Sequence, residues 1–174
     1  SEMYAGGVSG GLFYSNNGGL SWTEVNPEQE NLAVMTIAFS KDGDVYYGTG
    51  EGLYNTWTTG YGASTSSGFP GAGVFKKGAN ESQFTQLSAT TGFPSIGAIV
   101  TDPNDNNKVF MATSSGIRRS TDGGTTWSNP VTGTIGSNGT CWDIHMDAGG
   151  SLWATLGGRT MQSTDGGANW TEIS

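Results

Sequence analysis

Two aspartates stand directly before a pair of glycines and five residues before a tryptophan: Asp122 and Asp165. Exposed carboxylates could serve as general acids or bases, or bind a metal. A short carboxylate in a turn also accepts hydrogen bonds from the backbone N–H groups of that turn. Asn17 takes the same place in a third copy and keeps the acceptor without the charge. We therefore interpret these residues as structural turn residues.

The three copies align without gaps over eight residues, Ser-x-(Asp/Asn)-x-Gly-x-x-Trp. The glycines supply the positive φ angles that a tight hairpin needs, and the tryptophan is expected to pack back over the turn. The aligned positions are Ser15, Asn17, Gly19 and Trp22; Ser120, Asp122, Gly124 and Trp127; and Ser163, Asp165, Gly167 and Trp170.

Asp143 and His145 are a second pattern that could carry chemistry. They are two residues apart in an alternating run, so their side chains should share one face of a strand. Such a pair could orient an imidazole or begin a metal site. His145 is the only histidine, and the oxygen-rich turn 102–107 is more typical of a solvated hairpin than of a Ca²⁺ site. The sequence thus predicts no metal and no cofactor.

The stretch from Leu53 to Ala72 combines aromatic rings with small polar residues, which suits the recognition of a sugar. Rings can stack on the C–H face of a sugar, and amide, hydroxyl or carboxylate groups can bind its hydroxyls. The alternative is a surface loop whose rings bury one another. The predicted ligand-binding residues are Tyr54, Asn55, Trp57, Tyr61 and Glu51.

Composition narrows the class of protein. The 174 residues include 30 glycines, and the formal net charge is −8. An acidic chain lacks the basic surface that nucleic acid binding needs, and no apolar run is long enough to span a membrane. Glycine is unfavourable in helices, whereas short alternating runs bounded by Gly, Asn and Asp are typical of strands and turns. An all-β fold follows, with no helix longer than one or two turns.

Internal repeats predict the architecture. Asp122 and Asp165 are 43 residues apart, within the range of a four-stranded propeller blade. We expect residues 1–174 to form a single β-propeller segment with blades at about 3–25, 33–88, 96–129 and 141–173. The first blade should lack its innermost strand. The residues expected to pack sheet on sheet are Ile37, Phe39, Tyr46, Val100, Phe110, Ile144 and Trp153.

Strand parity predicts two faces. In a four-stranded meander, the turns between strands one and two and between strands three and four lie at one end. The loops between strands two and three, and those between blades, lie at the other. The Asp-containing turns and the 53–72 stretch should therefore lie on opposite faces, with the ligand on the face of the latter.

The eight-residue motif resembles the Asp-box, or BNR, repeat of secreted β-propellers. Residues 47–52 followed by 71–75 resemble the blade signature of the sortilin- and xyloglucanase-like group. That resemblance implies six to ten blades, hence further blades of the same parent protein. It also implies a secreted or cell-surface bacterial location, with Asp-boxes at the periphery rather than at the ligand site.

Three functions remain open at this point. The first is a scaffold that binds a glycan or an extracellular protein. The second is a glycoside hydrolase, xyloglucanase- or sialidase-like, whose catalytic pair is completed by other blades; the carboxylates available here are Glu28, Glu30, Glu51 and Asp143. The third is a structural or assembly module.

The motifs of the two hydrolase families are not complete in this sequence. In the xyloglucanase pattern an acid follows the threonine that ends the second strand, but Gly50 and Ser114 occupy those positions. The arginine triad that the sialidase pattern requires is missing as well. The sequence therefore favours a binding role over an enzyme.

Overall fold

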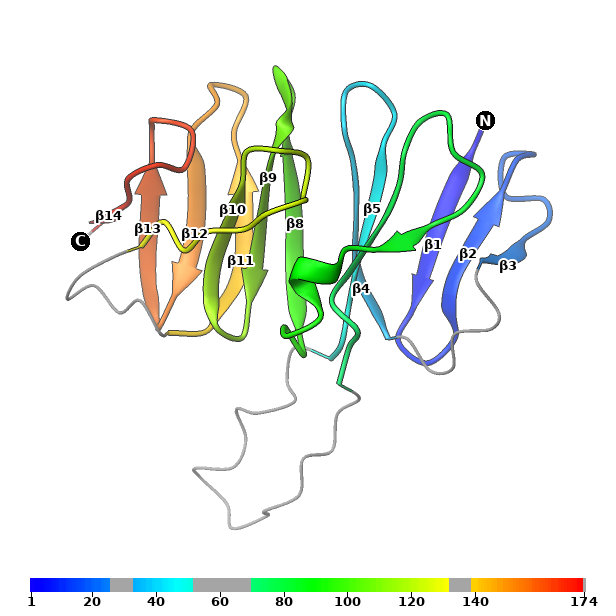
Figure 1. Cartoon of the computed structure of the whole chain (residues 1–174), viewed down its shortest axis with the longest axis horizontal. Coiled ribbons are helices and arrows are strands. Elements are labelled where there is room, and N and C mark those ends of the chain that lie inside the picture. The colour runs from blue at the N-terminus through cyan, green and yellow to red at the C-terminus, as the bar shows by residue number, and fades with distance from the viewer. Residues whose placement is uncertain (26–32, 52–69, 132–138, 174) are drawn as a thin grey trace, which may run out of the picture.

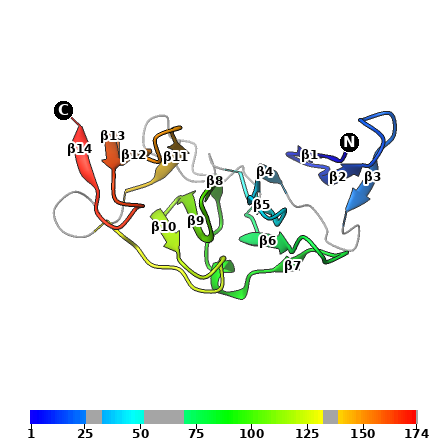
Figure 2. The ribbon, with the colours of Figure 1, turned by 90° about the horizontal axis from the view of Figure 1, so that it is seen from above.

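Four antiparallel sheets follow one another along the chain and form an open arc (Figures 1 and 2). The computed structural model describes residues 1–25, 33–51, 70–131 and 139–173. The four residues Tyr54, Asn55, Trp57 and Tyr61 lie outside this part of the chain. Within it, the single helical element is the 3-10 turn η2 (Ser88–Thr90). The fold is the all-β propeller segment that the repeats predict.

The strands of each sheet pair in the order in which they occur in the chain. Sheet 1 contains β1 (Met3–Gly7), β2 (Gly11–Ser15) and β3 (Thr23–Val25). Sheet 2 contains β4 (Val34–Phe39), β5 (Val45–Thr49), β6 (Val74–Lys77) and β7 (Thr85–Gln86). Sheet 3 contains β8 (Ile96–Asp102), β9 (Asp105–Thr113) and β10 (Gly116–Ser120). Sheet 4 contains β11 (Cys141–Met146), β12 (Leu152–Leu156), β13 (Arg159–Ser163) and β14 (Thr171–Ile173).

Sheets 1 and 3 each have three strands, for different reasons. In sheet 1 the eight-residue motif lies between β2 and β3, so β1 corresponds to the second strand of sheets 2 and 4. In sheet 3 the fourth strand of the expected four-stranded blade is reduced to a bridge, in which Arg119 and Ser128 exchange two hydrogen bonds of 2.9 Å. Pro130 follows two residues later and has no N–H to extend the ladder.

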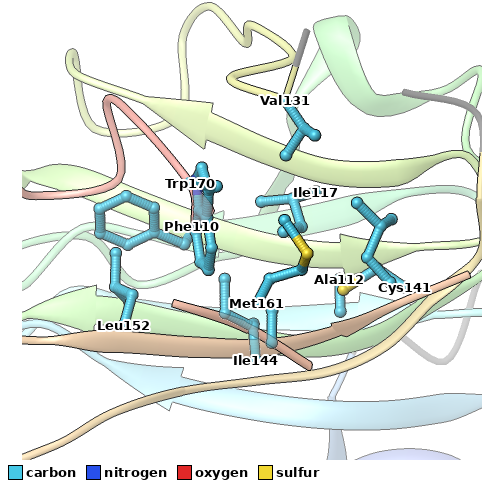
Figure 3. Packing of buried hydrophobic residues seen from close by; sticks show 11 residues of the cluster. Phe110, Ala112, Ile117, Val131, Cys141, Ile144, Leu152, Met161 and Trp170 are labelled. Carbon is cyan, nitrogen blue, oxygen red and sulfur yellow. The ribbon is translucent and has the colours of Figure 1, made fainter. Parts of the chain in front are cut away.

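The hydrophobic core lies between neighbouring sheets, as three clusters. Figure 3 shows the cluster between sheets 3 and 4, where Phe110, Met161 and Trp170 are buried together. Tyr46 and Val109 belong to the cluster between sheets 2 and 3. Each sheet therefore buries its faces only because another sheet follows it, as in other repeat architectures.

Four of the seven residues expected in this core are not fully buried: Ile37, Phe39, Val100 and Trp153. Phe39 is 54% exposed, because its neighbour on that side is sheet 1, which has no innermost strand to cover it. Trp153 is half-buried, because it lies on sheet 4, which no described sheet follows. Ile37 and Val100 are partly buried and pack against the clusters. Tyr46, Phe110 and Ile144 are buried as predicted.

The eight-residue motifs form three turns of the same construction, which we call the box turns (residues 15–22, 120–127 and 163–170). In each, a buried serine hydroxyl accepts a hydrogen bond from the N–H of the second glycine: Ser15 from Gly19 at 2.9 Å, Ser120 from Gly124 at 2.8 Å and Ser163 from Gly167 at 3.0 Å. The same hydroxyl donates to the side chain of Asn17, Asp122 or Asp165.

The acidic residue closes the second half of the box turn. Asp122 Oδ1 accepts the N–H of Thr126 at 2.8 Å, and Asp165 Oδ1 accepts the N–H of Asn169 at 2.9 Å. Gly124 has a φ of +95°, a conformation that other residues rarely adopt. The serine thus holds the glycine half of the turn, and the acid holds the half that leads to the tryptophan.

Removal of the serine hydroxyl should destabilise the whole segment. In Ser120→Ala the N–H of Gly124 stays buried without an acceptor, which costs about 1–3 kcal/mol of unfolding free energy. The matched control is Ser82→Ala, because Ser82 is exposed and its hydroxyl makes no hydrogen bond within the described residues. Chemical denaturation monitored by tryptophan fluorescence measures both. Equal losses in the two variants would contradict the role given to Ser120.

Candidate functional site

The arc has two distinct ends. The box turns and the hairpins between β4 and β5, β8 and β9, and β11 and β12 lie at one end, which we call the box face (Figure 1). The turns after β1, β9 and β12 lie at the opposite face. The described chain approaches residues 52–69 from both sides at this opposite face, with Glu51 and Pro70 as the flanking residues (Figure 1). The box turns and the two ends of this stretch therefore lie on opposite faces, as the alternating direction of the strands predicts.

The chain on either side of residues 52–69 is held by close backbone contacts. Gly50 N–H donates to Ala33 O at 2.9 Å, and Gly71 N–H donates to Pro94 O at 2.7 Å. A Cβ on Gly50 would come within 2.0 Å of the Pro94 carbonyl oxygen, so no larger residue fits there without a backbone shift. Glu51, the described member of the predicted ligand set, follows directly and is half-buried.

The threonine before the expected catalytic position has a structural role. Thr49 is fully buried; its hydroxyl donates to Gly73 O at 2.7 Å and accepts the N–H of Ala72 at 2.8 Å. Thr113 donates to Gly116 O at 2.7 Å in the same way. Both threonines join the second strand to the third. The residues that follow them, Gly50 and Ser114, bring no carboxylate to this position.

The innermost strands β4, β8 and β11 adjoin one another along the inside of the arc (Figure 2). Two hydrogen bonds join β8 to β4: Ile99 N–H donates to Thr36 Oγ1 at 3.1 Å, and the Thr101 hydroxyl donates to Phe39 O at 2.7 Å. Several large or polar side chains along these strands are exposed. They are Met35 and Phe39 on β4, and Trp142, Asp143 and His145 on β11.

An open groove of about 420 Å³ crosses the three innermost strands near the box face. Phe39, Val100 and Met146 provide apolar walls, and His145 and Asp147 lie at one side. Trp142, at the start of β11, lies toward the opposite face. The inside of the arc therefore offers two separate surfaces. One is the groove near the box face, and the other is the surface around Trp142, which lies toward the opposite face, as Glu51 does.

The carboxylate of Asp147 lies near His145 and belongs to the hairpin that follows β11. No hydrogen bond joins His145 to Asp143 within the described residues. Asp147 instead accepts Trp153 Nε1–H at 3.1 Å and the N–H of Ser151 at 2.9 Å. The hydrogen bond from Trp153 is the main cause that lowers the pKa of Asp147, and the charge of nearby His145 adds to it. Asp147 therefore fixes the β11–β12 hairpin.

Other residues that could carry chemistry are separated in space or unreactive. Arg118 lies over the Phe93 ring at 5.1 Å, Arg119 donates to Gly166 O at 2.9 Å, and Arg159 pairs with Glu172 at 2.9 Å. The three arginines contact different neighbours and form no triad. Burial raises the pKa of the Cys141 thiol to about 12, so it is not a nucleophile near neutral pH.

The oxygen-rich 102–107 turn is shorter than the sequence indicated. β8 continues to Asp102 and β9 begins at Asp105, because Asp102 accepts the N–H of Asn104 at 2.8 Å and so tightens the turn. Lys108 pairs with both aspartates, at 3.6 and 3.4 Å. Within the described residues no group of histidine, cysteine, aspartate and glutamate side chains could hold a metal. Glu28 and Glu30 lie outside those residues.

Comparison with known proteins finds one curated relative and several solved structures that are similar to the chain. No family model matches it. A curated xyloglucanase of Hypocrea jecorina (strain QM6a) is 28% identical over 188 aligned residues, which cover 91% of this chain and 22% of that protein. The chain thus spans about a fifth of the length of this relative.

Solved structures give the same fold. An ancestral GH74 enzyme matches 99% of this chain and 24% of its own, with a TM-score of 0.71 and 20% identity. The GH74 enzyme of Niastella koreensis matches 99% of this chain and 28% of its own, with a TM-score of 0.65 and 22% identity. The structure of YCF48 bound to D1 peptide is also similar, with a TM-score of 0.62 and 16% identity. The match covers 99% of this chain and 50% of the YCF48 chain.

The chain is therefore a β-propeller segment with a sequence relative among xyloglucanases. Propeller proteins that resemble it are longer than it is, as the covered shares show. In the described residues no helix is long and apolar enough to cross a membrane.

The box-turn acids should make the segment sensitive to acid. Hydrogen bonds from the Thr126 hydroxyl and N–H and from Ser120 lower the pKa of Asp122 to about 2, and the N–H and amide of Asn169 lower the pKa of Asp165. A depressed folded-state pKa stabilises the fold above the unfolded value of about 3.9, and this contribution is lost as the pH falls toward 2.

This acid sensitivity can be measured with Asp122→Asn, which keeps an acceptor as Asn17 does. We expect the variant to melt below wild type at pH 6, and the gap between their melting temperatures to narrow as the pH falls from about 4 toward 2. Asp143→Asn is the control, because the Asp143 carboxylate accepts no hydrogen bond within the described residues. A gap that stays constant with pH would contradict the assignment.

Proposed function

We propose that this chain is part of an extracellular, xyloglucanase-like β-propeller protein and that it binds xyloglucan or a related polysaccharide on the inside of the arc, toward the opposite face. The observation that carries this proposal is the similarity to a curated xyloglucanase across 91% of the chain. The GH74 structures support it at the level of the fold.

The exposed side chains at the inner, opposite-face end fit such a ligand. Trp142 is 39% exposed, and Asp143, the next residue along β11, is exposed as well. An exposed indole can stack on the apolar face of a sugar ring, and a carboxylate can accept bonds from its hydroxyls. Glu51 and the 52–69 stretch, with Tyr54, Asn55, Trp57 and Tyr61, would extend this surface, since both ends of that stretch lie on the same face.

We place polysaccharide cleavage, as distinct from binding, in blades other than these four. A glycosidase needs two carboxyl groups on either side of the scissile bond. The positions after Thr49 and Thr113 have no acid, and Thr49 and Thr113 themselves are engaged in structural hydrogen bonds. The four blades therefore supply binding surface to a hydrolase-like ring rather than its catalytic pair. An extracellular location follows from the polysaccharide ligand.

Trp142→Ala tests the binding surface directly. Titration calorimetry of the 174-residue chain with xyloglucan oligosaccharides should show binding by wild type and a loss of about 1–3 kcal/mol in Trp142→Ala, the range of an aromatic anchor. Phe39→Ala is the matched control, because Phe39 is also exposed on the inside of the arc but lies near the box face.

The outcomes separate the alternatives. A loss confined to Phe39→Ala would place the ligand in the groove near the box face and contradict the site. Binding by neither variant nor wild type would contradict the polysaccharide itself and leave a protein ligand or an assembly role. Reducing-sugar assays with the same chain should show no release, and release would contradict the placement of the catalytic pair in other blades.

A further inference from the structure

The innermost strands β4, β8 and β11 each contain a β-bulge near the end that lies toward the opposite face (Figure 1). On β4, Val34 pairs with Thr49 and Thr36 pairs with Gly48, so two residues, Met35 and Thr36, lie opposite one residue of β5. β8 and β11 show the same register shift beside the residue that ends the second strand. We call the first residue of each two-residue bulge the bulge position, and its occupants are Met35, Gly97 and Trp142.

A backbone hydrogen bond beyond each bulge keeps the two strands together. The N–H of the residue after the second strand donates to the carbonyl of the residue before the innermost strand: Gly50 to Ala33 at 2.9 Å, Ser114 to Ser95 at 3.4 Å and Gly157 to Thr140 at 3.0 Å. Because the strands are joined on both sides of the bulge, fraying of the strand end cannot absorb the extra residue. The bulge is therefore a fixed part of each blade, and a bulge re-aims the side chain at its position.

Sheet 3 shows the direction in which the bulge position faces, because an innermost strand lies on each side of β8. A Cβ on Gly97 would come within 2.6 Å of the Trp142 carbonyl oxygen. The bulge position of sheet 3 therefore faces the bulge position of sheet 4. Since Gly97 has no side chain, the β11 backbone at Trp142 lies close against β8.

Met35 shows how a long side chain is accommodated at the bulge position. It is 39% exposed, although sheet 3 follows on the side that this position faces. The hydrogen bond from Ile99 N–H to Thr36 Oγ1 holds β8 close to β4 beside the bulge. The methionine is therefore not buried between the two strands, and its thioether is exposed on the inside of the arc. Trp142, at the same position of sheet 4, is exposed on the same surface.

A thioether and an indole on one surface suit a chain of sugar rings. The indole can stack on the apolar face of a ring, and the unbranched, polarisable methionine side chain can adapt to another. Because β4, β8 and β11 are neighbours along the inside of the arc, a chain that crosses them would pass Met35, Gly97 and Trp142 in turn (Figure 2). Glu51 follows Gly50, whose hydrogen bond closes the β4 bulge, so this surface adjoins the base of the 52–69 stretch.

We infer that the bulge positions form one binding row for the polysaccharide, in which Met35 contacts the ligand and Gly97 is a positioning residue that sets the direction of the Trp142 ring. This inference rests on the proposed function, because it assigns the row to the same ligand. Any further blade with the same bulge would add one residue to the row. The residue at the bulge position of each blade would then determine which sugar units fit.

Titration calorimetry with xyloglucan oligosaccharides tests Met35. Met35→Ala should raise the dissociation constant about 3–10-fold, because it removes one of the apolar contacts of the row. Met3→Ala is the matched control, since Met3 is 42% exposed but lies on sheet 1, outside the row. The control should bind like wild type.

The same titration tests Gly97. Gly97→Ala should raise the dissociation constant ~10-fold or more, because the added Cβ displaces the Trp142 backbone and turns its ring away from the ligand. Gly92→Ala is the control, since a Cβ there would meet no atom of another described segment within 4 Å. Neither glycine has a positive φ, so the two substitutions differ in their contacts and not in backbone strain.

A double-mutant cycle separates positioning from a general loss of structure. If Gly97 acts through Trp142, Gly97→Ala should weaken binding in the wild-type background and have little further effect in a Trp142→Ala background. Thermal unfolding of the same samples shows whether each variant is folded. Met35→Ala and Met3→Ala test the row even if Gly97→Ala does not fold.

The outcomes separate this inference from the proposed function. Weaker binding by Met35→Ala, together with a Gly97→Ala effect that disappears without the Trp142 ring, supports the row. Binding that only Trp142→Ala weakens keeps the proposed function and overturns the row. A Gly97→Ala effect that is equally large in the Trp142→Ala background overturns the positioning role. A wild-type chain that binds no oligosaccharide overturns the proposed function and this inference together.

Discussion

The interaction on which the arrangement of sheets depends is a buried hydrogen bond from the second glycine N–H of a box turn to a serine hydroxyl. In sheet 3 it joins Gly124 to Ser120 at 2.8 Å, and it keeps the two glycines in left-handed conformations. With the glycine N–H so engaged, the carbonyl of Gly123 points away from its own sheet and accepts Lys76 and Tyr46 of the preceding one. A local turn thereby becomes a contact between blades.

This contact explains where the core lies. A three- or four-stranded sheet has two faces and cannot bury both alone, so the clusters form between sheets. The tryptophan that ends each box turn contributes to these clusters only where a preceding sheet exists, as Trp170 does and Trp22 does not. Exposed apolar surface therefore gathers on sheet 1, and the half-buried Trp153 marks sheet 4.

The division of the molecule into two faces separates stability from ligand binding. The box face contains the turns that hold the sheets together, and within sheet 2 it contains the ion pair of Lys76 with Asp44 at 2.8 Å. At the opposite face the chain around Gly50 and Gly71 is fixed by backbone contacts, which provide a rigid base for residues 52–69. The proposed polysaccharide surface depends on that base and on Trp142.

The sequence alone determined the all-β fold and the three turns, because a 43-residue spacing, glycine pairs and alternating runs are local signals. It also identified Ser15, Ser120 and Ser163 as motif positions, but it gave the main role in the turn to the acid. Only the tertiary structure decided that the serine is the buried partner, that Asp147 fixes the β11–β12 hairpin, and that Phe39 and Trp153 are incompletely covered. These properties depend on which sheet lies opposite each residue, and burial by a neighbouring blade leaves no periodic pattern in the residue's own strand.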